Sequence, residues 1–326
     1  MNDWLQDCLA CPRDKLPVVA SGETLACAQG HEYPIVDGIP VMLVEEAEDT
    51  HPYIRETLEK VARWKTDQTI EESHPAGDGD VDGFVQHEVL FTSGYLYKPV
   101  QYKLWRYPIP ASRLPRGDRK YLIDIGCNWG RWSIAAARLG YETVGIDPGI
   151  DAILAARRVA KTLGVRASFV IGDARFLPFA DNVFDTAFSH SVLPSFSKEN
   201  VVLALDEVSR VLKPSARSLL QMPNKYGLRQ YQQRRRRQFT EGGGFETRYW
   251  SPGELMETFK ERIGPTSMTA DCFFGLGIQP SDADLLPLRY RAVVYSSEIL
   301  RRISTVFSPL TKVADSVYLE SVNQKS

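Results

Sequence analysis

The stretch Tyr121-Leu-Ile-Asp-Ile-Gly-Cys-Asn-Trp-Gly130, together with the run Thr143-Val-Gly-Ile146 that follows it, decides the fold. Its first residues are apolar apart from Asp124 and predict a buried strand, and the glycines predict a turn. The next residues have the spacing of a helix up to Leu139, and Gly140 stops that helix before the second strand begins. The order strand, helix, strand predicts two parallel neighbours joined by a helical crossover.

The same alternation continues downstream. Apolar patterns predict helices over 151–163 and 198–212 and strands over 167–171, 186–189 and 218–222. Further on, Ser251-Pro-Gly-Glu254 predicts a capping box that opens another helix, and strands are expected at 267–274 and 316–322. Helices that alternate with strands in this way cover both faces of a parallel sheet, so the expected fold class is α/β.

The turn after the first strand predicts a ligand site. A glycine turn lets the backbone approach a ligand at a helix N-terminus, and an acidic residue about 20 positions on, here Asp147, can hold both hydroxyls of a ribose. An adenosine-bearing cofactor fits both features. The fingerprint of dinucleotide-binding proteins would need glycines at 126, 128 and 131, where the chain has Gly126, Asn128 and Arg131. This pattern argues against NAD or FAD.

The pattern acid-x-Gly-x-x-x-Gly at 124–130 resembles the first motif of the class I (Rossmann-like) S-adenosylmethionine-dependent methyltransferases, and the similarity continues in order from 121 to 222. Gly172-Asp-Ala174 resembles the adenine-binding turn of that family. Leu177-Pro-Phe179 with Phe184-Asp185 resembles the approach to its fourth strand, and Glu207 with Arg210-Val-Leu-Lys-Pro214 resembles the helix before its fifth.

The resemblance implies a seven-stranded methyltransferase sheet and S-adenosylmethionine as the cofactor. The positions that it implies for cofactor binding are Asp124, Gly126, Cys127, Gly130, Asp147, Pro148, Asp173, Ala174 and Ser189. Methyl transfer from a sulfonium needs mainly alignment of acceptor, methyl and sulfur, so a general base is needed only where the reacting atom of the acceptor is still protonated.

His190 is the candidate for that base. It follows the fourth strand, where members of the family often contact the cofactor and face the substrate, and histidine side chains suit base catalysis near neutral pH. The alternative is a histidine that only forms a hydrogen bond at the end of a strand. His87, Glu88 and Asp271 are weaker candidates for the same role, because only their polarity in an aromatic neighbourhood recommends them.

Two ligand pairs near the N-terminus predict a structural Zn²⁺ site. Cys8-x2-Cys11 and Cys27-x3-His31 have the spacings of a tetrahedral site, which has no open position for catalysis. The region resembles the zinc-ribbon family that includes the small activator subunit of eukaryotic tRNA, rRNA and release-factor methyltransferases. In that family the second ligand usually falls at the position of Asp14. Either Cys8 or Asp14 could complete the set, or the metal has been lost; thiolate affinity for zinc favours Cys8.

The chain divides into three expected parts. Residues 1–46 form the zinc-ribbon module, 47–112 a helical linker with an aromatic cap, and 113–326 the methyltransferase domain, with an insertion at about 275–312 between its last two strands. Within the linker, a helix is expected around Ile54 to Trp64, and 71–83 is expected to be a mobile surface loop. The cap and the segment 224–312 together are expected to form the acceptor pocket.

Two basic segments follow the fifth strand. Arg229 and the run Arg234 to Arg237 are interleaved with aromatic residues, and they form either a solvated helix face or a site for an anionic group on the substrate. In the insertion, Ala292, Ile299, Ile303 and Val306 form one apolar stripe. That helix could pack on the core, lie on a membrane interface or close a dimer.

Composition limits the classes of partner. With 43% apolar and 25% charged residues, the composition is typical of a globular protein. The net charge of −2 means that the molecule as a whole has no electrostatic attraction to nucleic acids or anionic membranes. No secretory signal and no apolar run of about 18 residues is found, so we expect a cytoplasmic protein.

Three functions follow from these observations. The first is methylation of a small-molecule, lipid-linked or glycan-linked acceptor that carries an anionic group. The second is methylation of RNA or a translation factor, which the ribbon and the arginine run suggest and net acidity weighs against. The third is a non-catalytic scaffold that binds the cofactor and activates a partner methyltransferase. Met222-Pro-Asn224 after the fifth strand lacks the signature of amino-methylating nucleic-acid enzymes.

Overall fold

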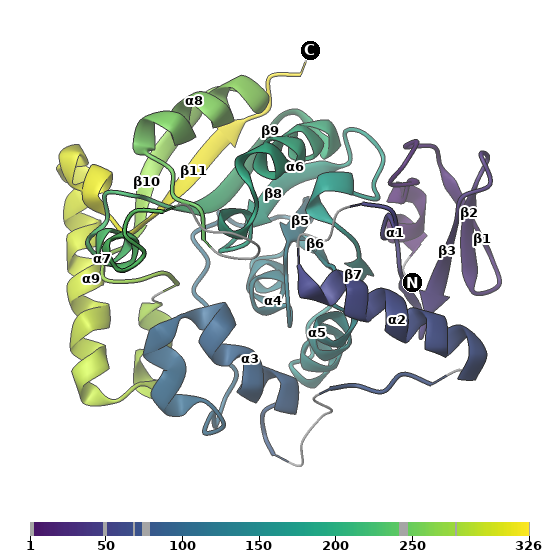
Figure 1. The fold of residues 1–326 in the computed structure, drawn as a ribbon, viewed down its shortest axis with the longest axis horizontal. Coiled ribbons are helices and arrows are strands. Elements are labelled where there is room, and N and C mark those ends of the chain that lie inside the picture. The colour runs from purple at the N-terminus through teal and green to yellow at the C-terminus, as the bar shows by residue number, and fades with distance from the viewer. Residues whose placement is uncertain are drawn as a thin grey trace.

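A computed structural model describes residues 3–47, 51–67, 69–73, 79–240, 247–277 and 279–325. It contains a seven-stranded sheet in the order β10-β11-β9-β8-β5-β6-β7 and a smaller four-stranded sheet in the order β1-β2-β3-β4. Figure 1 shows the large sheet in the centre, with helices on both of its faces and the small sheet at one side. The predicted α/β class, with a Rossmann-like seven-stranded sheet and an N-terminal β module, is confirmed.

The strands match the predicted runs except for β9, which begins at Leu212, the residue predicted to end the preceding helix, and not at 218. The seven are β5 (Tyr121–Ile125), β6 (Glu142–Asp147), β7 (Ser168–Ile171), β8 (Phe184–Ser189), β9 (Leu212–Pro223), β10 (Thr266–Cys272) and β11 (Ser316–Val322). The five from β5 to β9 pair in parallel, whereas β11 lies antiparallel between β9 and β10. The chain order reverses between β5 and β8, which creates a topological switch point there.

Two apolar layers cover the sheet. On one face lie α4 (Arg131–Arg138), α5 (Ile150–Thr162), α2 (Pro52–Asp67) and α3 (Gly83–Ser93); on the other lie α6 (Lys198–Val211) and α8 (Pro252–Arg262). The inward positions predicted for α6 are buried, as Val201, Leu205 and Val208 show. The capping box predicted at the start of α8 is present, because Ser251 and Glu254 cap each other's backbone N–H groups.

The N-terminal module packs against the edge of the large sheet. It consists of α1 (Asp3–Cys8), β1 (Val18–Ser21), β2 (Thr24–Cys27), β3 (Glu32–Val36) and β4 (Ile39–Pro40). The predicted Asp37-Gly38 turn joins β3 to β4, with both residues at positive φ. Beyond β4, Val41 bridges Ile171 of β7, and the backbone N–H of Met42 donates to the Ile171 carbonyl at 2.8 Å. The module therefore covers an edge strand that would otherwise be open.

The predicted aromatic cap is largely helical. It contains α3 and the 3-10 helix η1 (Tyr95–Val100), and Asp82 caps α3 by accepting the backbone N–H of Phe84. Part of the surface loop predicted for 71–83 lies outside the described residues. The insertion between the last two strands contains η4 (Pro280–Leu285), α9 (Leu288–Val306) and η5 (Ser308–Val313), and α7 (Leu228–Arg236) follows β9. Among the helices of the described chain, none has the length and apolarity needed to span a bilayer.

Candidate functional site

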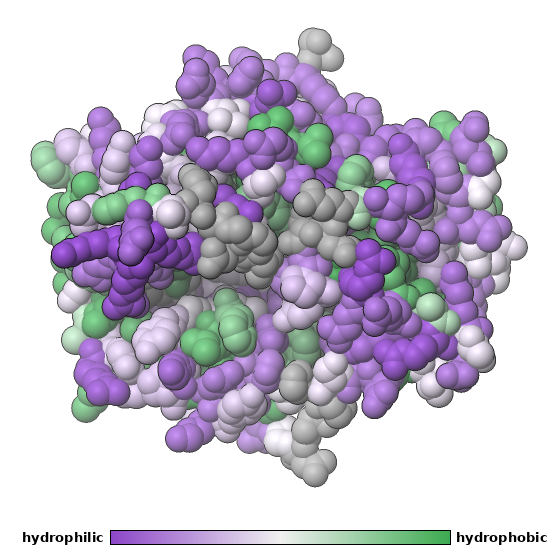
Figure 2. Space-filling view, viewed as in Figure 1, coloured by the Kyte–Doolittle hydropathy of each residue, from purple (hydrophilic) through white to green (hydrophobic). Residues whose placement is uncertain are grey.

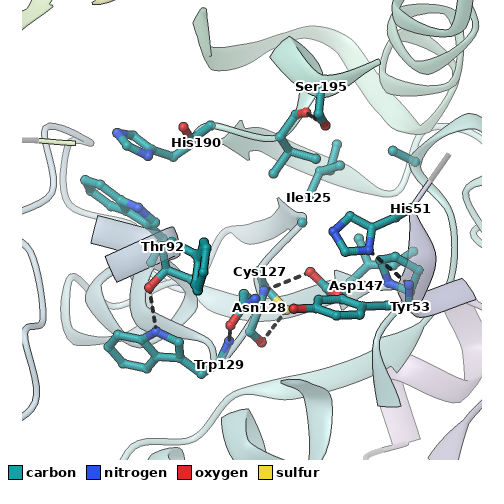
Figure 3. Close-up of a pocket in the computed structure, with 18 of the residues that line it drawn as sticks. His51, Tyr53, Thr92, Ile125, Cys127, Asn128, Trp129, Asp147, His190 and Ser195 are labelled. Carbon is teal, nitrogen blue, oxygen red and sulfur yellow. Dashed lines mark hydrogen bonds between the residues drawn. The ribbon is translucent and has the colours of Figure 1, made fainter. Parts of the chain in front are cut away.

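A cavity of about 1150 Å³, measured with its open mouth, lies at the carboxyl ends of the central strands. Its walls come from the turns that follow β5, β6, β7 and β8, and from side chains of the linker and cap. The cavity lies at the switch point between β5 and β8, which is where open α/β sheets bind their ligands. Figure 3 shows the residues of these turns around a common space.

The two glycines of the turn after β5 have different roles. Gly126 lines the cavity at a φ of +72°, and a Cβ there would lie 2.1 Å from Cγ2 of Val192. Any side chain at this position would therefore displace the segment after β8. Gly130 has a φ of +78° and lies against Phe169 instead of the cavity. The first glycine keeps the cavity open, and the second lets α4 begin directly after the turn.

Asp147, the last residue of β6, lies at the cavity wall beside the turn after β5 (Figure 3). Its carboxylate accepts the backbone N–H groups of Gly149 at 2.9 Å and Asn128 at 3.0 Å. Burial raises the pKa of this carboxyl to about 6. Each oxygen of a carboxylate has two lone pairs, so Asp147 can accept two more hydrogen bonds from a ligand such as a sugar diol.

Asp124 and Ser189 do not line the cavity, and both bond to neighbouring residues of the sheet and of α4. Asp124 accepts a hydrogen bond from the Ser133 hydroxyl at 2.6 Å, and burial raises the pKa of its carboxyl to about 7. The hydroxyl of Ser189 donates to the carbonyl of Ile125 at 2.9 Å and so ties β8 to β5. These side chains hold the start of α4 and the strand ends in place, and a ligand in the cavity does not meet them directly.

Asp173 already has a cationic partner. Its carboxylate accepts the backbone N–H of Arg175 at 2.8 Å and the guanidinium of the same residue at 2.7 Å. Asp173 and Ala174 both line the cavity, so the turn predicted to hold an adenine is in place. An adenine amine would have to share this carboxylate with Arg175.

Of the nine predicted cofactor residues, the structure brings six to the cavity and leaves three behind it. Those that line the cavity are Gly126, Cys127, Asp147, Pro148, Asp173 and Ala174. Those that do not are Asp124, Gly130 and Ser189. Asp124 bonds to Ser133, Ser189 donates to the carbonyl of Ile125 and Gly130 packs on Phe169, so these three residues contact neighbouring protein groups instead of the cavity.

The linker and cap supply further lining residues, of which the sequence analysis named only Glu88, as a weaker candidate for the base. They are His51 and Tyr53 at the start of α2 and Glu88, Phe91 and Thr92 in α3. Thr92 also accepts a hydrogen bond from the Trp129 indole at 3.1 Å, which ties the cap to the turn after β5 (Figure 3). In the sequence, the sign that this helix lines a site is the charged residue Glu88 beside apolar neighbours. The structure buries that side chain, with Glu88 only 4% exposed.

His190 lies just after β8, where the cavity described above meets a second cavity, whose walls are residues 91–96, residues 274–277 and α7 residues that include Arg229. Its side chain is buried, and within the described residues neither ring nitrogen has a hydrogen-bond partner. The nearest carboxylate is Oδ2 of Asp271, 3.7 Å from Nε2, and the ring packs on Trp132. The alternative expectation is a histidine whose ring forms a hydrogen bond at the end of a strand, and no such bond is present among the described residues. The weaker candidates His87 and Glu88 pair with each other at 3.0 Å.

The arginine run 234–237 lies outside both cavities in the described part of the chain. Arg234 donates to the carbonyl of Lys225 and stacks on Phe239 and Tyr249. Figure 2 shows a strongly hydrophilic patch where α7 lies in Figure 1. Of the basic residues on α7, it is Arg229 that reaches a cavity wall.

Four potential metal ligands gather in the N-terminal module. They are Cys11, Asp14, Cys27 and His31, whose ligand atoms all lie within 4.8 Å of one another. The His31 Nδ1 atom is 3.4 Å from each thiol sulfur and 3.0 Å from the Asp14 carboxylate. A tetrahedral zinc site with bonds of about 2.0 to 2.3 Å has ligand atoms roughly 3.3 to 3.8 Å apart. The two sulfur–nitrogen distances fall within this range, and the cluster supplies four candidate ligands.

The prediction that favoured Cys8 as the fourth ligand differs from this arrangement. Cys8 ends α1, and its carbonyl accepts the backbone N–H of Ala180, so it lies against the large domain. The Cys11 carbonyl accepts the backbone N–H of Lys15, and this tight turn brings Asp14 beside Cys27 at 3.2 Å.

Comparison with known sequences identifies the central region. A family described as a methyltransferase domain matches residues 122–215. The demethylmenaquinone methyltransferase of Staphylococcus carnosus is 32% identical over 120 residues, which cover 35% of this chain and 47% of that protein. The chain thus spans about half the length of the curated relatives it matches.

Among solved structures, a S-adenosylmethionine-dependent methyltransferase of Methanosarcina mazei is 26% identical and covers 51% of this chain and 89% of its own, with a TM-score of 0.42. One from Thermotoga maritima is 15% identical and covers 85% of this chain and 100% of its own, with a TM-score of 0.44. The family match over residues 122–215 coincides with the strands and turns that build the cavity. This part of the chain is therefore a class I S-adenosylmethionine-dependent methyltransferase domain.

Proposed function

We propose that the chain transfers the methyl group of S-adenosylmethionine to a small-molecule, lipid-linked or glycan-linked acceptor. The observation that carries the proposal is the carboxylate of Asp147 beside the Gly126 turn, in a cavity at the switch point. When bound, the cofactor supplies an electrophilic methyl group. Asp147 would hold its ribose, the turn at Asp173 and Ala174 its adenine, and His190 would face the acceptor.

The relatives support the choice of acceptor class. By its name, the Staphylococcus carnosus relative methylates demethylmenaquinone, and we extend a small, lipid-soluble acceptor class to this chain as a proposal. Methylation of RNA or a translation factor is the second candidate, which the exposed Arg235 and Arg236 on α7 favour. A net charge of −2 weighs against it. A scaffold that activates a partner would need the same cofactor cavity but no acceptor pocket of its own.

We further propose that Cys11, Asp14, Cys27 and His31 hold one structural Zn²⁺. With this assignment, the chain would divide into the metal-binding N-terminal module at residues 1–46, the linker and cap at 47–112, and the catalytic domain at 113–326, with its insertion at about 275–312. The four ligands leave no open coordination position, and none of them lines the cofactor cavity. The metal would stabilise this module instead of taking part in methyl transfer.

A surface partner is proposed for α9. Its exposed side carries Tyr295, Ile299, Ile303 and Val306, whereas the buried side includes Ser297 and Ser304. Five basic residues and one acidic residue lie between 286 and 313, in a chain that is acidic overall. Two copies of this helix would bring like charges together, so we propose that the stripe contacts an anionic membrane surface.

A methyl-transfer assay tests the function. The purified chain is incubated with methyl-labelled cofactor and separated fractions of small molecules, lipids and RNA, and label is expected in the first two. Asp147→Asn should weaken cofactor binding by roughly 10-fold to 100-fold in calorimetry, because a charge-assisted hydrogen bond is lost. Wild-type affinity should fall below about pH 6, where Asp147 takes up a proton, and the variant should not share this dependence.

Asp118→Asn is the matched control, since Asp118 is exposed and lies before β5. Equal cofactor affinity in Asp147→Asn and the control, or label in RNA alone, would contradict the proposal.

Elemental analysis tests the metal site. Protein purified without chelator should contain about one zinc per chain, and Asp14→Ala should lower that content together with the thermal stability of the protein. Cys8→Ser should retain the metal. A metal-free wild type, or loss of zinc in Cys8→Ser but not in Asp14→Ala, would refute the assignment.

Vesicle flotation tests the role of α9. Vesicles that contain phosphatidylglycerol should bind the wild type, and Ile299→Asp with Val306→Asp should abolish binding, because both side chains are exposed. Val19→Asp is the control, on an exposed residue of the N-terminal module. Wild-type protein that stays with the vesicle-free fraction, or that forms an α9-dependent dimer in solution, would overturn the membrane proposal.

A further inference from the structure

A second cavity adjoins the cofactor cavity. Its walls come from the end of α3 and η1 (residues 91–96), from α7, and from the segment 274–277 after β10. The two cavities share Phe91, Thr92, His190 and Ser191. A molecule in the second cavity would therefore meet the contents of the first at His190.

Two buried polar groups at this cavity lack partners within the described residues. They are Oε1 of Gln230, whose side chain belongs to a residue that is 1% exposed, and both ring nitrogens of His190. Native proteins rarely leave buried polar atoms unpaired, because each such atom loses its bonds to water. Both residues line the second cavity, so a ligand with polar groups can satisfy them.

The cavity also has a cationic wall and aromatic walls. Arg229 donates one N–H to the carbonyl of Phe274 at 3.2 Å and lies over the ring of Tyr95. No carboxylate of the described chain lies within 4 Å of its guanidinium, so its other N–H groups remain available. Phe91, Tyr95 and Phe274 supply flat apolar surfaces. Guanidinium forks match carboxylates and phosphates, and aromatic walls favour planar molecules.

Asp271, which does not line the cavity, holds a negative charge beside His190. Burial alone would raise the pKa of this carboxyl, but the nearby His190 and the guanidinium of Arg113, 3.3 Å away, lower it to about 2. The Ser316 hydroxyl also donates to Asp271 at 2.8 Å. The Asp271 carboxylate thus lies beside the imidazole of His190, 3.7 Å from its Nε2 atom.

We propose that the second cavity is the acceptor site and takes a compact planar molecule with an anionic group at Arg229 and a hydroxyl at His190. This inference rests on the proposed function. The hydroxyl oxygen forms a bond to the methyl carbon, and the carbon–sulfur bond of the cofactor breaks with its electron pair left on sulfur. The hydroxyl proton passes to a ring nitrogen of His190, and S-adenosylhomocysteine departs.

The probe 4-hydroxy-3-nitrobenzoate tests both ends of this site, because it carries a carboxylate and a hydroxyl whose ionisation changes its visible absorbance. A molecule of this size should bind with a dissociation constant in the millimolar range. At a pH below the pKa of the free probe, binding should produce the phenolate band. Arg229→Gln should weaken binding about tenfold, and His190→Gln should remove the phenolate band.

Arg235→Gln is the matched control, because Arg235 is an exposed arginine of the same helix and lines neither cavity. Calorimetry with S-adenosylhomocysteine on the same samples separates the two claims. If the wild type binds S-adenosylhomocysteine but not the probe, or if Arg229→Gln and Arg235→Gln bind the probe equally, the acceptor site is wrong while the function stands. Wild type that binds no S-adenosylhomocysteine refutes the function itself.

Discussion

The buried ion pair between Arg131 and Asp282 fixes the position of the insertion relative to α4, and with it the walls of the two cavities. Arg131 is the first residue of α4, and its guanidinium lies 3.0 Å from the Asp282 carboxylate in η4. The same guanidinium donates to the hydroxyl of Ser93 at 2.6 Å and to the carbonyl of Pro108. An unpaired buried guanidinium would cost several kcal/mol, so the cap and the insertion must both close on the start of α4. Their closure forms the walls of the acceptor side.

The N-terminal module supports the opposite side of the cofactor cavity. The backbone N–H of Met42 donates to the carbonyl of Ile171, the last residue of β7, and Val41 pairs with Ile171 in a β-bridge. The residues after Ile171 form the turn that contains Asp173. A module of this size cannot build a large core alone, and its buried side chains Leu5, Leu25 and Met42 belong to the same apolar cluster as the large sheet. A metal at the cluster around Cys11 and His31 would act on the cavity only by keeping the edge of the sheet ordered.

The sequence predicts what depends on local pattern and misses what depends on long-range packing. The strands near Asp124, the α6 face around Val201 and the capping box at Ser251 follow from periodicity and caps, and the structure confirms them. The position of Asp14 beside Cys27 and His31 depends on how the turn from Cys11 to Lys15 folds. Arg229 lines a cavity and Arg234 to Arg237 do not. This difference depends on the direction in which α7 leaves β9, which no local sequence pattern contains.

The central claim is that the cofactor and the acceptor occupy adjoining cavities that meet at His190. A crystal structure of the protein with S-adenosylhomocysteine tests it most directly. The account predicts the ribose hydroxyls on Asp147, the adenine at Asp173 and Ala174, and the sulfur directed toward His190, with the cavity beside Arg229 still open. An adenosyl group in the cavity beside Arg229, or a ribose that makes no contact with Asp147, would contradict it.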